Sequence, residues 1–480
     1  MKGAWFVILG AAASLAFPPY NMWFLVILFV FPIREAIKNN SISKGFQAGL
    51  FFGLGLFFVG TYWIYLSLYH YGGQSVAISL GLVFFLCVYL SLYLGIGNLF
   101  LSILSRKISP LYLIFIIVII FSLLELVRGS LLGGFSWFSL YHSQLYGPFR
   151  GLFPIFGSSG VSFIILYLIG SVAVMVDATT VHKKVILTSM SLVFIFSMLV
   201  FEIQWTKSIN TGYQFSLIQG GFSQEERLSF VQRHSMQSYY LDTVNKEIEK
   251  ADIVILPEGS LLNTSALSKI PTIEDKLVIT GILELTDNNA YNTIVAVSDK
   301  KQLYRKRFLV PFGEYIPGGN LINNWFTKLR LPIPAISSGQ LAQEPFIFNE
   351  IIIGTTICFE DTFSKAYTSY SRSNVFINLT NDAWFIDSKG LDQHFSFSQI
   401  RALEYGKYTL RVANTGVTAY IGPDGEVIDR LRTIDQNILR GNLIVSEGST
   451  PYGLFGSLPL LGFFLILFIA QSIMTKLRIF

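Results

Sequence analysis

The stretch 351–358 has the sequence IIIGTTIC, an apolar run rich in β-branched residues that ends directly in a thiol. A run of this length and composition predicts a buried β-strand. A second run, IVILPE at 253–258, ends in a carboxylate in the same way. Ligands of α/β sheets bind at the carboxyl ends of strands. We therefore expect Cys358 and Glu258 to face one crevice.

Strand and helix signals alternate on both sides of these runs, from about Gln204 to Ser446. Ser223 and Glu226 form a capping box, which predicts a helix carrying Leu228, Val231 and Val244 on its apolar face. Strands are expected at 214–219, 252–257, 277–285, 291–298, 351–358, 374–378 and 417–421, and a helix at about 392–408. The pattern predicts a single α/β domain over residues 204–450.

The two ends of the chain are far more apolar than this domain. Hydrophobic residues make up 52% of the sequence and charged residues only 14%, against roughly a quarter charged in typical domains. A helix of about 20 apolar residues crosses a bilayer, so we predict a polytopic α-helical membrane bundle of about eight spans. The spans are expected near residues 4–18, 20–33, 46–68, 75–104, 110–127, 156–178, 185–201 and 455–474.

Basic residues between these spans fall on one side of the predicted bundle. They are Lys2, Arg34, Lys38, Lys44, Arg106, Lys107, Lys183, Lys184, Lys476 and Arg478, whereas the short loops 18–21 and 69–73 carry none. Loops rich in Lys and Arg stay in the cytoplasm. Both termini are therefore predicted to be cytoplasmic and the α/β domain extracytoplasmic. The domain plan is helices 1–7 in residues 1–203, the α/β domain in 204–450 and a final helix in 451–480.

Two further features of the membrane part stand out. The predicted outside loop 128–156 is rich in glycine and aromatic residues, which is typical either of an interfacial aromatic belt or of a lid that contacts lipid. Gly49, Gly53 and Gly55 lie in the third predicted span and indicate close helix packing.

Taken singly, the polar groups of the α/β domain have ordinary structural explanations. A cysteine after an apolar strand is most often a small core residue. A carboxylate there is most often a helix cap, and the Lys/Arg group near Lys306 has the composition of a surface. Histidine is the usual base for a thiol, but His394 follows no predicted strand, so a Cys358–His394 dyad is the weaker alternative.

Several classes of site and partner are not indicated. The ligand spacing of a zinc site is absent from the sequence, so no metal site is expected. Cys87 lies in an apolar run, apart from Cys358 in the polar domain, and no disulfide is expected. No basic patch is interleaved with aromatic residues, so nucleic acid is not an expected partner.

The combination of groups is more specific than any of its parts. A strand followed by Glu258, then Lys306, then a strand followed by Cys358 resembles the Glu-Lys-Cys triad of the nitrilase (carbon–nitrogen hydrolase) superfamily. Nested between membrane spans, the domain resembles that of the apolipoprotein N-acyltransferase family. The stretches KRFLVPFGE at 306–314, NDAWF at 381–385 and RALE at 401–404 are close to those of the family.

The resemblance implies a nitrilase-like αββα sandwich for the extracytoplasmic domain and a role for each matched residue. Cys358 would be the nucleophile and Glu258 its general base. Lys306 would stabilise the oxyanion together with the backbone N–H of Phe359. The supporting carboxylates would be Glu314 and Glu360, and the residues expected near the substrate are Asn381, Trp384, Phe135 and Trp137.

The function implied by the resemblance is transfer of an acyl chain from a membrane phospholipid to the N-terminal cysteine amine of bacterial apolipoproteins. The reaction would be ping-pong, through a thioester on Cys358, and would need no cofactor. The acceptor would be the lipoprotein's diacylglyceryl-cysteine. The expected enzyme is a monomer in the bacterial inner membrane, with its catalytic domain on the periplasmic side.

Some positions depart from the family pattern. Phe359 and Ser136 stand where the family often has Tyr and Pro, and Gly221 and Leu228 where it often has Asn and Trp. These departures bear on contacts with the substrate and leave the triad intact.

Two other functions are alternatives. A membrane-tethered amidase or nitrile hydrolase would use water as the acceptor, but a single anchor would suffice for it. The other is a transporter or receptor whose outside domain merely binds a ligand; apart from Glu125, the predicted spans hold almost no ionisable residue, so no proton or ion relay is visible. Lateral access for a lipid donor favours the acyltransferase.

Overall fold

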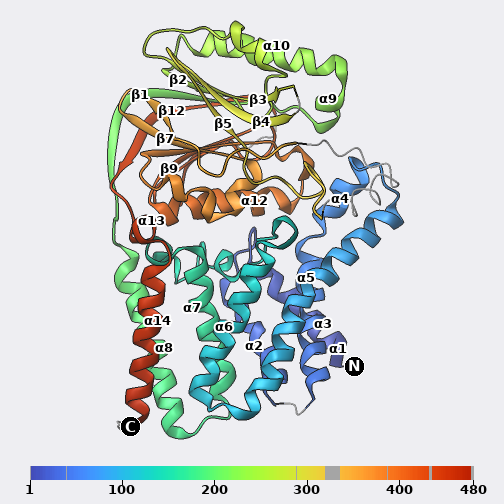
Figure 1. Cartoon of the computed structure of the whole chain (residues 1–480), viewed down its shortest axis with the longest axis vertical. Helices are drawn as coiled ribbons and strands as arrows, with labels where there is room; N and C mark the ends of the chain where they lie inside the picture. Colours follow the sequence, from blue (N-terminus) through green and yellow to red (C-terminus); the bar gives the residue numbers. More distant parts are fainter. Residues whose placement is uncertain are drawn as a thin grey trace. The chain divides into compact units, whose positions relative to one another are not determined.

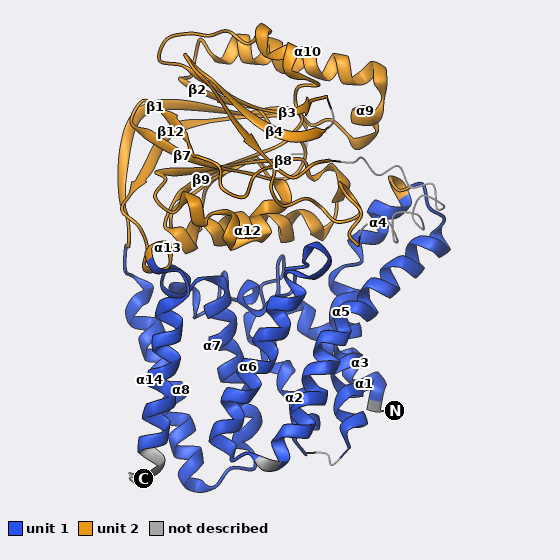
Figure 2. Ribbon diagram, in the orientation of Figure 1, with its two compact units in different colours: residues 1–69, 73–204, 455–480 blue, residues 70–72, 205–454 orange. Residues whose placement is uncertain are grey.

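A computed structural model of the chain describes residues 2–38, 41–287, 289–318, 336–385, 387–431 and 435–476. The chain divides into two compact units (Figure 2). The helical unit comprises Met1–Tyr69, Gly73–Gln204 and Phe455–Phe480, and the α/β unit comprises His70–Gly72 and Trp205–Leu454. Arg478, one of the predicted cytoplasmic cations, lies outside the described residues.

The helical unit consists of apolar helices (Figure 1). They are α1 (Lys2–Ala13), α2 (Val30–Lys38), α3 (Ile42–Gly60), α4 (Trp63–His70), α5 (Val76–Leu104), α6 (Pro110–Arg128), α7 (Phe153–Met175), α8 (Thr180–Phe201) and α14 (Leu458–Lys476). Among the described residues, five segments are long and apolar enough to cross a membrane. These are α3, α5, α6, α7 with the turn before it, and α8, whereas Gly3–Ala16 and Leu458–Ile473 are shorter apolar helices.

The structure does not confirm the predicted count of eight spans. The predicted span 20–33 is a 3-10 helix, Trp23–Phe29, followed by the first residues of α2. The predicted span 46–68 is divided between α3 and α4 at Thr61 and Tyr62. Hydropathy identified the apolar stretches correctly, but it does not show where a helix bends or changes its hydrogen-bonding pattern.

Glycine allows α3 to touch its neighbours, as the sequence predicted. A Cβ atom added to Gly55 would lie 1.9 Å from the carbonyl oxygen of Val7 in α1. On another side of the helix, a Cβ atom on Gly49 would lie 2.4 Å from the carbonyl oxygen of Leu94 in α5. These distances are far below van der Waals contact, so α3 packs backbone to backbone against α1 and α5.

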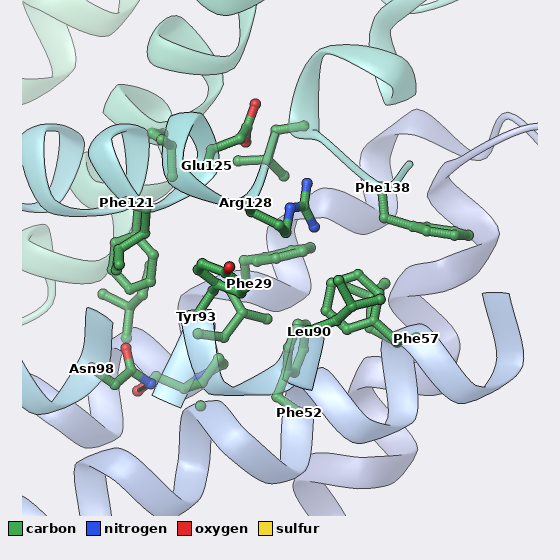
Figure 3. A pocket seen from close by; sticks show the side chains of 18 residues that line it. Phe29, Phe52, Phe57, Leu90, Tyr93, Asn98, Phe121, Glu125, Arg128 and Phe138 are labelled. Carbon is green, nitrogen blue, oxygen red and sulfur yellow. Dashed lines mark hydrogen bonds between the residues drawn. The ribbon is translucent and has the colours of Figure 1, made fainter. Parts of the chain in front are cut away.

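The segment that joins α6 to α7 is packed into the helical unit rather than being an open loop. Arg128, expected at the start of this loop, is the last residue of α6 and is buried, donating to Ser139 Oγ at 2.9 Å. Glu125, one turn earlier, accepts from Ser162 Oγ at 2.6 Å. Both residues line a small cavity of about 50 Å³, where aromatic rings such as Phe57 surround the guanidinium (Figure 3).

The α/β unit contains two six-stranded sheets. In the first sheet the order is β12 (Asn437–Glu447), β1 (Lys207–Gln219), β2 (Ile253–Ile255), β3 (Leu277–Leu285), β4 (Ala290–Val297), β5 (Lys301–Arg305). In the second it is β11 (Val427–Arg430), β10 (Ala419–Ile421), β9 (Tyr408–Ala413), β8 (Val375–Thr380), β7 (Ile351–Ile357), β6 (Phe346–Phe348). Figure 1 shows the sheets lying between α10 (Phe230–Glu247) and α12 (Lys389–Tyr405).

Most predicted strands are present, and the differences have local causes. The predicted capping box of Ser223 is formed, but the helix breaks at Ser229 into α9 (Gln224–Leu228) and α10. The prediction of one apolar face was therefore wrong: Val244 is buried, whereas Leu228 and Val231 are 58% and 74% exposed. The helix predicted to reach residue 408 ends at Tyr405, because the next residue is a glycine in the left-handed conformation.

We expect Gly55→Ala to lower the unfolding temperature of the detergent-solubilised protein, because the added methyl group collides with a backbone oxygen. Overpacking of this kind costs about 1–3 kcal/mol. Gly81→Ala on α5 is the matched control, since a Cβ atom there meets no atom within 4 Å. Thermal unfolding of both variants checks the packing, and equal unfolding temperatures would contradict it.

Candidate active site

Cys358 follows β7 directly and adopts a left-handed backbone conformation, with φ of +50°. Such a conformation costs a non-glycine residue roughly 1–3 kcal/mol and persists only where its surroundings enforce it. The residue begins a 3-10 helix, Cys358–Thr362, so the chain turns sharply at the sulfur. The turn exposes the thiol at the end of the strand, and the side chain is only partly buried.

Glu258 lies just beyond β2, in a turn that glycine makes possible. Gly259 has a φ of +60°, and a Cβ atom on Gly281 of β3 would lie 2.7 Å from Glu258 Cα. Arg227 of α9 binds the same turn, donating to the carbonyl oxygens of Glu258 and Gly259 at 3.3 and 3.4 Å. Asn292 Nδ2 donates to the Glu258 carboxylate at 2.6 Å. The carboxylate is thus fixed through its backbone and through one of its oxygens.

Lys306 follows β5 and is almost completely buried. Its Nζ lies 2.8 Å from Glu314 Oε1 and 3.7 Å from Glu258 Oε1. Glu314 is held in turn by the backbone N–H of Val310, at 2.7 Å, and by Asn292, at 3.3 Å. The ammonium group therefore lies between two carboxylates, and one asparagine amide contacts both of them.

Glu360 connects the two sheets behind the site. Its buried carboxylate accepts from the backbone N–H of Ile357, at the end of β7, at 2.8 Å. It also accepts from the backbone N–H of Arg307, at 2.7 Å, and from the hydroxyl of Tyr304 on β5, at 2.7 Å. Burial raises the pKa of this carboxyl, and Arg307 with the hydrogen bonds opposes that effect. Glu360 thus ties the Lys306 segment to the cysteine turn.

The structure brings Glu258, Lys306 and Cys358 together. Both charged groups act electrostatically on the thiol, Glu258 raising its pKa and Lys306 lowering it. Three elements from two sheets, far apart in the sequence, therefore supply a carboxylate, an ammonium group and a thiol at one place.

The other predicted residues have varied positions. Phe359 is buried and its ring packs against Phe363. Asn381 is buried and accepts from Asn414 Nδ2 at 2.9 Å, while Trp384 is 43% exposed. Phe135 and Trp137 belong to the helical unit, where their rings lie 5.2 Å apart. The roles of these residues in substrate contact remain predictions.

Known protein families match both units. The apolipoprotein N-acyltransferase N-terminal domain family matches residues 9–172, and the carbon-nitrogen hydrolase family matches residues 232–440. The chain is 32% identical over 489 residues to the apolipoprotein N-acyltransferase of Wigglesworthia glossinidia brevipalpis, covering 96% of this chain and 95% of that protein. It belongs to the apolipoprotein N-acyltransferase family.

A second relative agrees with this assignment. The apolipoprotein N-acyltransferase of Haemophilus ducreyi is 30% identical over 475 residues, covering 93% of this chain and 92% of that protein. Among solved structures, a carbon-nitrogen hydrolase from Helicobacter pylori G27 is 14% identical, with a TM-score of 0.36, over 48% of this chain and 88% of that one. As a member of its family, the chain is a membrane acyltransferase of lipoprotein biosynthesis.

Sequence reasoning missed several groups of this acyltransferase site. Asn292 lies within β4 and Arg227 in α9, and no motif marks either residue. Their roles follow only from the register of β4 against β5 and from the approach of α9 to β2. Once the strand register is known, the pairing of Thr293 with Arg305 predicts that Asn292 lies near Lys306.

One group of potential metal ligands lies in the described part of the chain. Atoms of Cys358, Asp382 and His394 lie within 4.8 Å of one another. However, Arg411 donates to Asp382 at 2.8 Å and its Nη2 lies 3.0 Å from His394 Nδ1. A guanidinium cation thus already balances this carboxylate, and a divalent cation would be repelled.

The charges around the thiol set its resting state. Burial raises the pKa of Cys358, the charge of Glu258 raises it further, and Lys306 lowers it. Burial would lower the pKa of Lys306, but Glu314, Glu258 and Cys358 together raise it above its ordinary value. At neutral pH the site therefore holds a protonated thiol next to a permanently charged ammonium group.

We expect Glu258→Gln to accelerate alkylation of Cys358 by iodoacetamide at neutral pH. Removing the negative charge lowers the thiol pKa, and a shift of one unit changes the thiolate fraction about 10-fold. Lys306→Met should slow the same reaction for the opposite reason. Glu284→Gln is the control, since its carboxylate pairs with Arg305 instead. Alkylation rates against pH test the assignment, and slower alkylation in Glu258→Gln would contradict it.

Proposed function

We propose that the chain transfers an acyl chain from a membrane phospholipid to the N-terminal cysteine amine of bacterial lipoproteins, through a thioester on Cys358. The observation that carries this proposal is the meeting of the thiol with Glu258 and Lys306, whose charged atoms lie 3.7 Å apart. Membership in the family supports lipoprotein N-acylation. The phospholipid donor is what the family resemblance implies, and the covalent intermediate is what a thiol beside a base and a cation can form.

The first half-reaction loads the thiol. Glu258 takes the proton from Cys358, and the sulfur attacks the ester carbonyl carbon of the phospholipid. Lys306 and the backbone N–H of Phe359 would stabilise the tetrahedral oxyanion, and a single such donor is worth roughly 3–4 kcal/mol elsewhere. The carbon–oxygen bond then breaks, and protonated Glu258 returns its proton to the oxygen of the departing lysophospholipid.

The second half-reaction empties the thiol. The free amine of the lipoprotein's diacylglyceryl-cysteine attacks the thioester carbon, and Glu258 accepts the proton that the nitrogen loses. The carbon–sulfur bond breaks, an amide forms, and Glu258 returns the proton to the cysteine sulfur. One carboxylate thus serves both steps, which fits its fixed position against Asn292 and near Lys306.

We expect purified protein incubated with phospholipid vesicles to gain one acyl mass on Cys358, removable by neutral hydroxylamine. Cys358→Ser should give no hydroxylamine-labile adduct, and Glu258→Gln should load at least about 100-fold more slowly, since general acid–base catalysis contributes 10²–10⁴-fold. Intact-mass analysis makes the measurement. Absence of an adduct in the wild type would contradict the proposed thioester intermediate.

The acceptor is tested by adding a peptide with an N-terminal diacylglyceryl-cysteine to the loaded enzyme. The expected product is the N-acylated peptide, appearing as the thioester disappears. If the acyl group were released as free fatty acid at the same rate without peptide, water would be the acceptor and the protein would act as a hydrolase.

We also infer that the enzyme lies in the bacterial inner membrane with both termini in the cytoplasm and the α/β unit on the periplasmic side. The distribution of Lys and Arg among the loops supports this orientation. Asp299, between β4 and β5, and Lys183, near the start of α8, are both exposed, and this orientation would put them on opposite sides of the membrane.

Asp299→Cys and Lys183→Cys are introduced separately into a background with Cys87→Ala and Cys358→Ala. An impermeant maleimide added to intact spheroplasts should label the cysteine at position 299 and spare the one at 183. Permeabilised cells should label both. The reverse pattern in intact spheroplasts would place the α/β unit in the cytoplasm.

A further inference from the structure

A second set of polar groups lies on the side of Cys358 that does not carry Lys306. Strand β8 runs parallel to β7, with Ile357 paired to Leu379. Cys358, the residue after β7, therefore lies beside Thr380, the last residue of β8. Thr380 is fully buried next to the thiol, and its hydroxyl lowers the pKa of Cys358. The same hydroxyl donates to Asp382 Oδ1 at 3.1 Å.

Asp382 is a fixed anion behind the sulfur. His394 Nδ1 lies 2.7 Å from one of its oxygens, and Arg411 donates to the other at 2.8 Å. Burial alone would raise the pKa of Asp382, but its contacts with His394 and Arg411 lower the pKa to about 2. The carboxylate therefore stays charged at neutral pH and remains able to accept the hydrogen bond from Thr380.

His394 also reaches the cysteine backbone. Its Nε2 lies 3.3 Å from the carbonyl oxygen of Cys358, so the ring spans the gap between Asp382 and the strained turn. The weaker alternative from the sequence, a Cys358–His394 dyad, stays a prediction: a ring nitrogen of His394 lies within 4.8 Å of the sulfur, and the ring also contacts the carbonyl oxygen and the carboxylate. Thr380 is a further polar neighbour of the sulfur on this side.

A hydroxyl group has one proton and two lone pairs. While the Thr380 proton points at Asp382, the oxygen presents lone pairs to the sulfur, which suits a thiol that donates its S–H. A thiolate needs the opposite arrangement, a donor aimed at the sulfur. Rotation of the O–H bond alone changes one arrangement into the other, so no heavy atom has to move.

We propose that Thr380 is a catalytic residue whose hydroxyl donates to Asp382 in the resting enzyme and turns to donate to the Cys358 sulfur whenever the sulfur is a thiolate. The inference rests on the proposed thioester function. The thiol proton goes to Glu258, and the Thr380 proton never leaves its oxygen. In the thioester the sulfur is neutral, and the hydroxyl returns to Asp382.

This role predicts which measured quantities change. The thiolate forms before the attack on the donor lipid and is the leaving group of the second half-reaction. A hydrogen bond from Thr380 to the sulfur should therefore accelerate both chemical steps. The hydroxyl is turned toward the sulfur and Asp382, so binding of the donor lipid should not depend on it. Glu258, Lys306, Asp382 and Arg411 are charged groups that act on the thiol, and a ring nitrogen of His394 lies within 4.8 Å of it; all five are retained when only Thr380 is changed.

The test compares Thr380→Val, which keeps the shape and loses the hydroxyl, with Thr380→Ser, which keeps the hydroxyl and loses the methyl group. Thr409→Val on neighbouring β9 is the matched control, because that threonine is equally buried and donates only to the backbone oxygen of Lys407, at 3.4 Å. For each variant the maximal rate of hydroxylamine-labile loading, the half-saturating donor concentration, the pH profile of iodoacetamide alkylation and the unfolding temperature are measured.

Thr380→Val should lower the maximal loading rate at least about 10-fold, given the 10²–10³-fold measured for loss of one transition-state donor elsewhere. The half-saturating donor concentration should stay within about 2-fold, because the change affects chemistry and not binding. The alkylation profile should move to higher pH, since a donor to the thiolate lowers the thiol pKa. Thr380→Ser should restore the rate to within about 3-fold of the unmodified enzyme, by the same argument.

Three results would overturn the inference: unchanged loading by Thr380→Val, a Thr380→Ser variant as slow as Thr380→Val at an unchanged unfolding temperature, or a raised half-saturating concentration with an unchanged maximal rate. If Thr380→Val does not fold, Thr380→Ala is measured against Thr380→Ser in the same way. An unmodified enzyme that never forms the adduct contradicts the proposed function itself. An unmodified enzyme that loads, with Thr380→Val equally fast, contradicts only the role of Thr380.

Discussion

The carboxylate of Glu360 is the contact on which the site depends. It is completely buried and accepts from the backbone of Ile357 in one sheet and from Arg307 and Tyr304 at the edge of the other. Removing it would leave several buried donors without a partner, each costing roughly 1–3 kcal/mol. The same contacts fix the distance between the strand that ends in Cys358 and the segment that carries Lys306. A fully buried carboxylate therefore helps to determine whether the thiol and the ammonium group meet.

Two carboxylates, Glu258 and Glu314, lie close together around Lys306, and their like charges must be compensated. Glu258 and Glu314 share one ammonium group, Lys306, and their Oε1 atoms lie 3.7 and 2.8 Å from its Nζ. An amide has two N–H donors, and Asn292 directs its Nδ2 to both carboxylates, at 2.6 and 3.3 Å. The amide reduces the repulsion between the two anions without adding a charge. This arrangement suits the proton transfer proposed for Glu258, while Glu314 holds the lysine in place.

Local pattern was enough to predict the strands that end in Glu258 and Cys358, because an apolar β-branched run fixes a buried strand whatever its partners are. The order of Glu, Lys and Cys then gave the candidate triad. The sequence pattern did not identify Asn292 and Thr380 as site residues because each lies within a strand. What such a side chain contacts depends on which strand lies next to it. The helix break at Ser229 and the 3-10 geometry of Trp23–Phe29 were missed for a related reason. Both are set by packing, and hydrophobic periodicity carries no such information.

The geometry around Cys358 joins backbone strain to electrostatics. A left-handed φ of +50° aims the sulfur away from its strand, and the turn is enforced by Glu360 on one side and by contact with His394 on the other. Two anions, Glu258 and Asp382, then act on the sulfur, and both raise its pKa. This arrangement keeps the thiol protonated at neutral pH, so that a reactive thiolate is not present at rest. The proposed thioester chemistry would then require donors that respond when the sulfur becomes charged, and a fixed ammonium group together with a rotatable hydroxyl would meet that requirement.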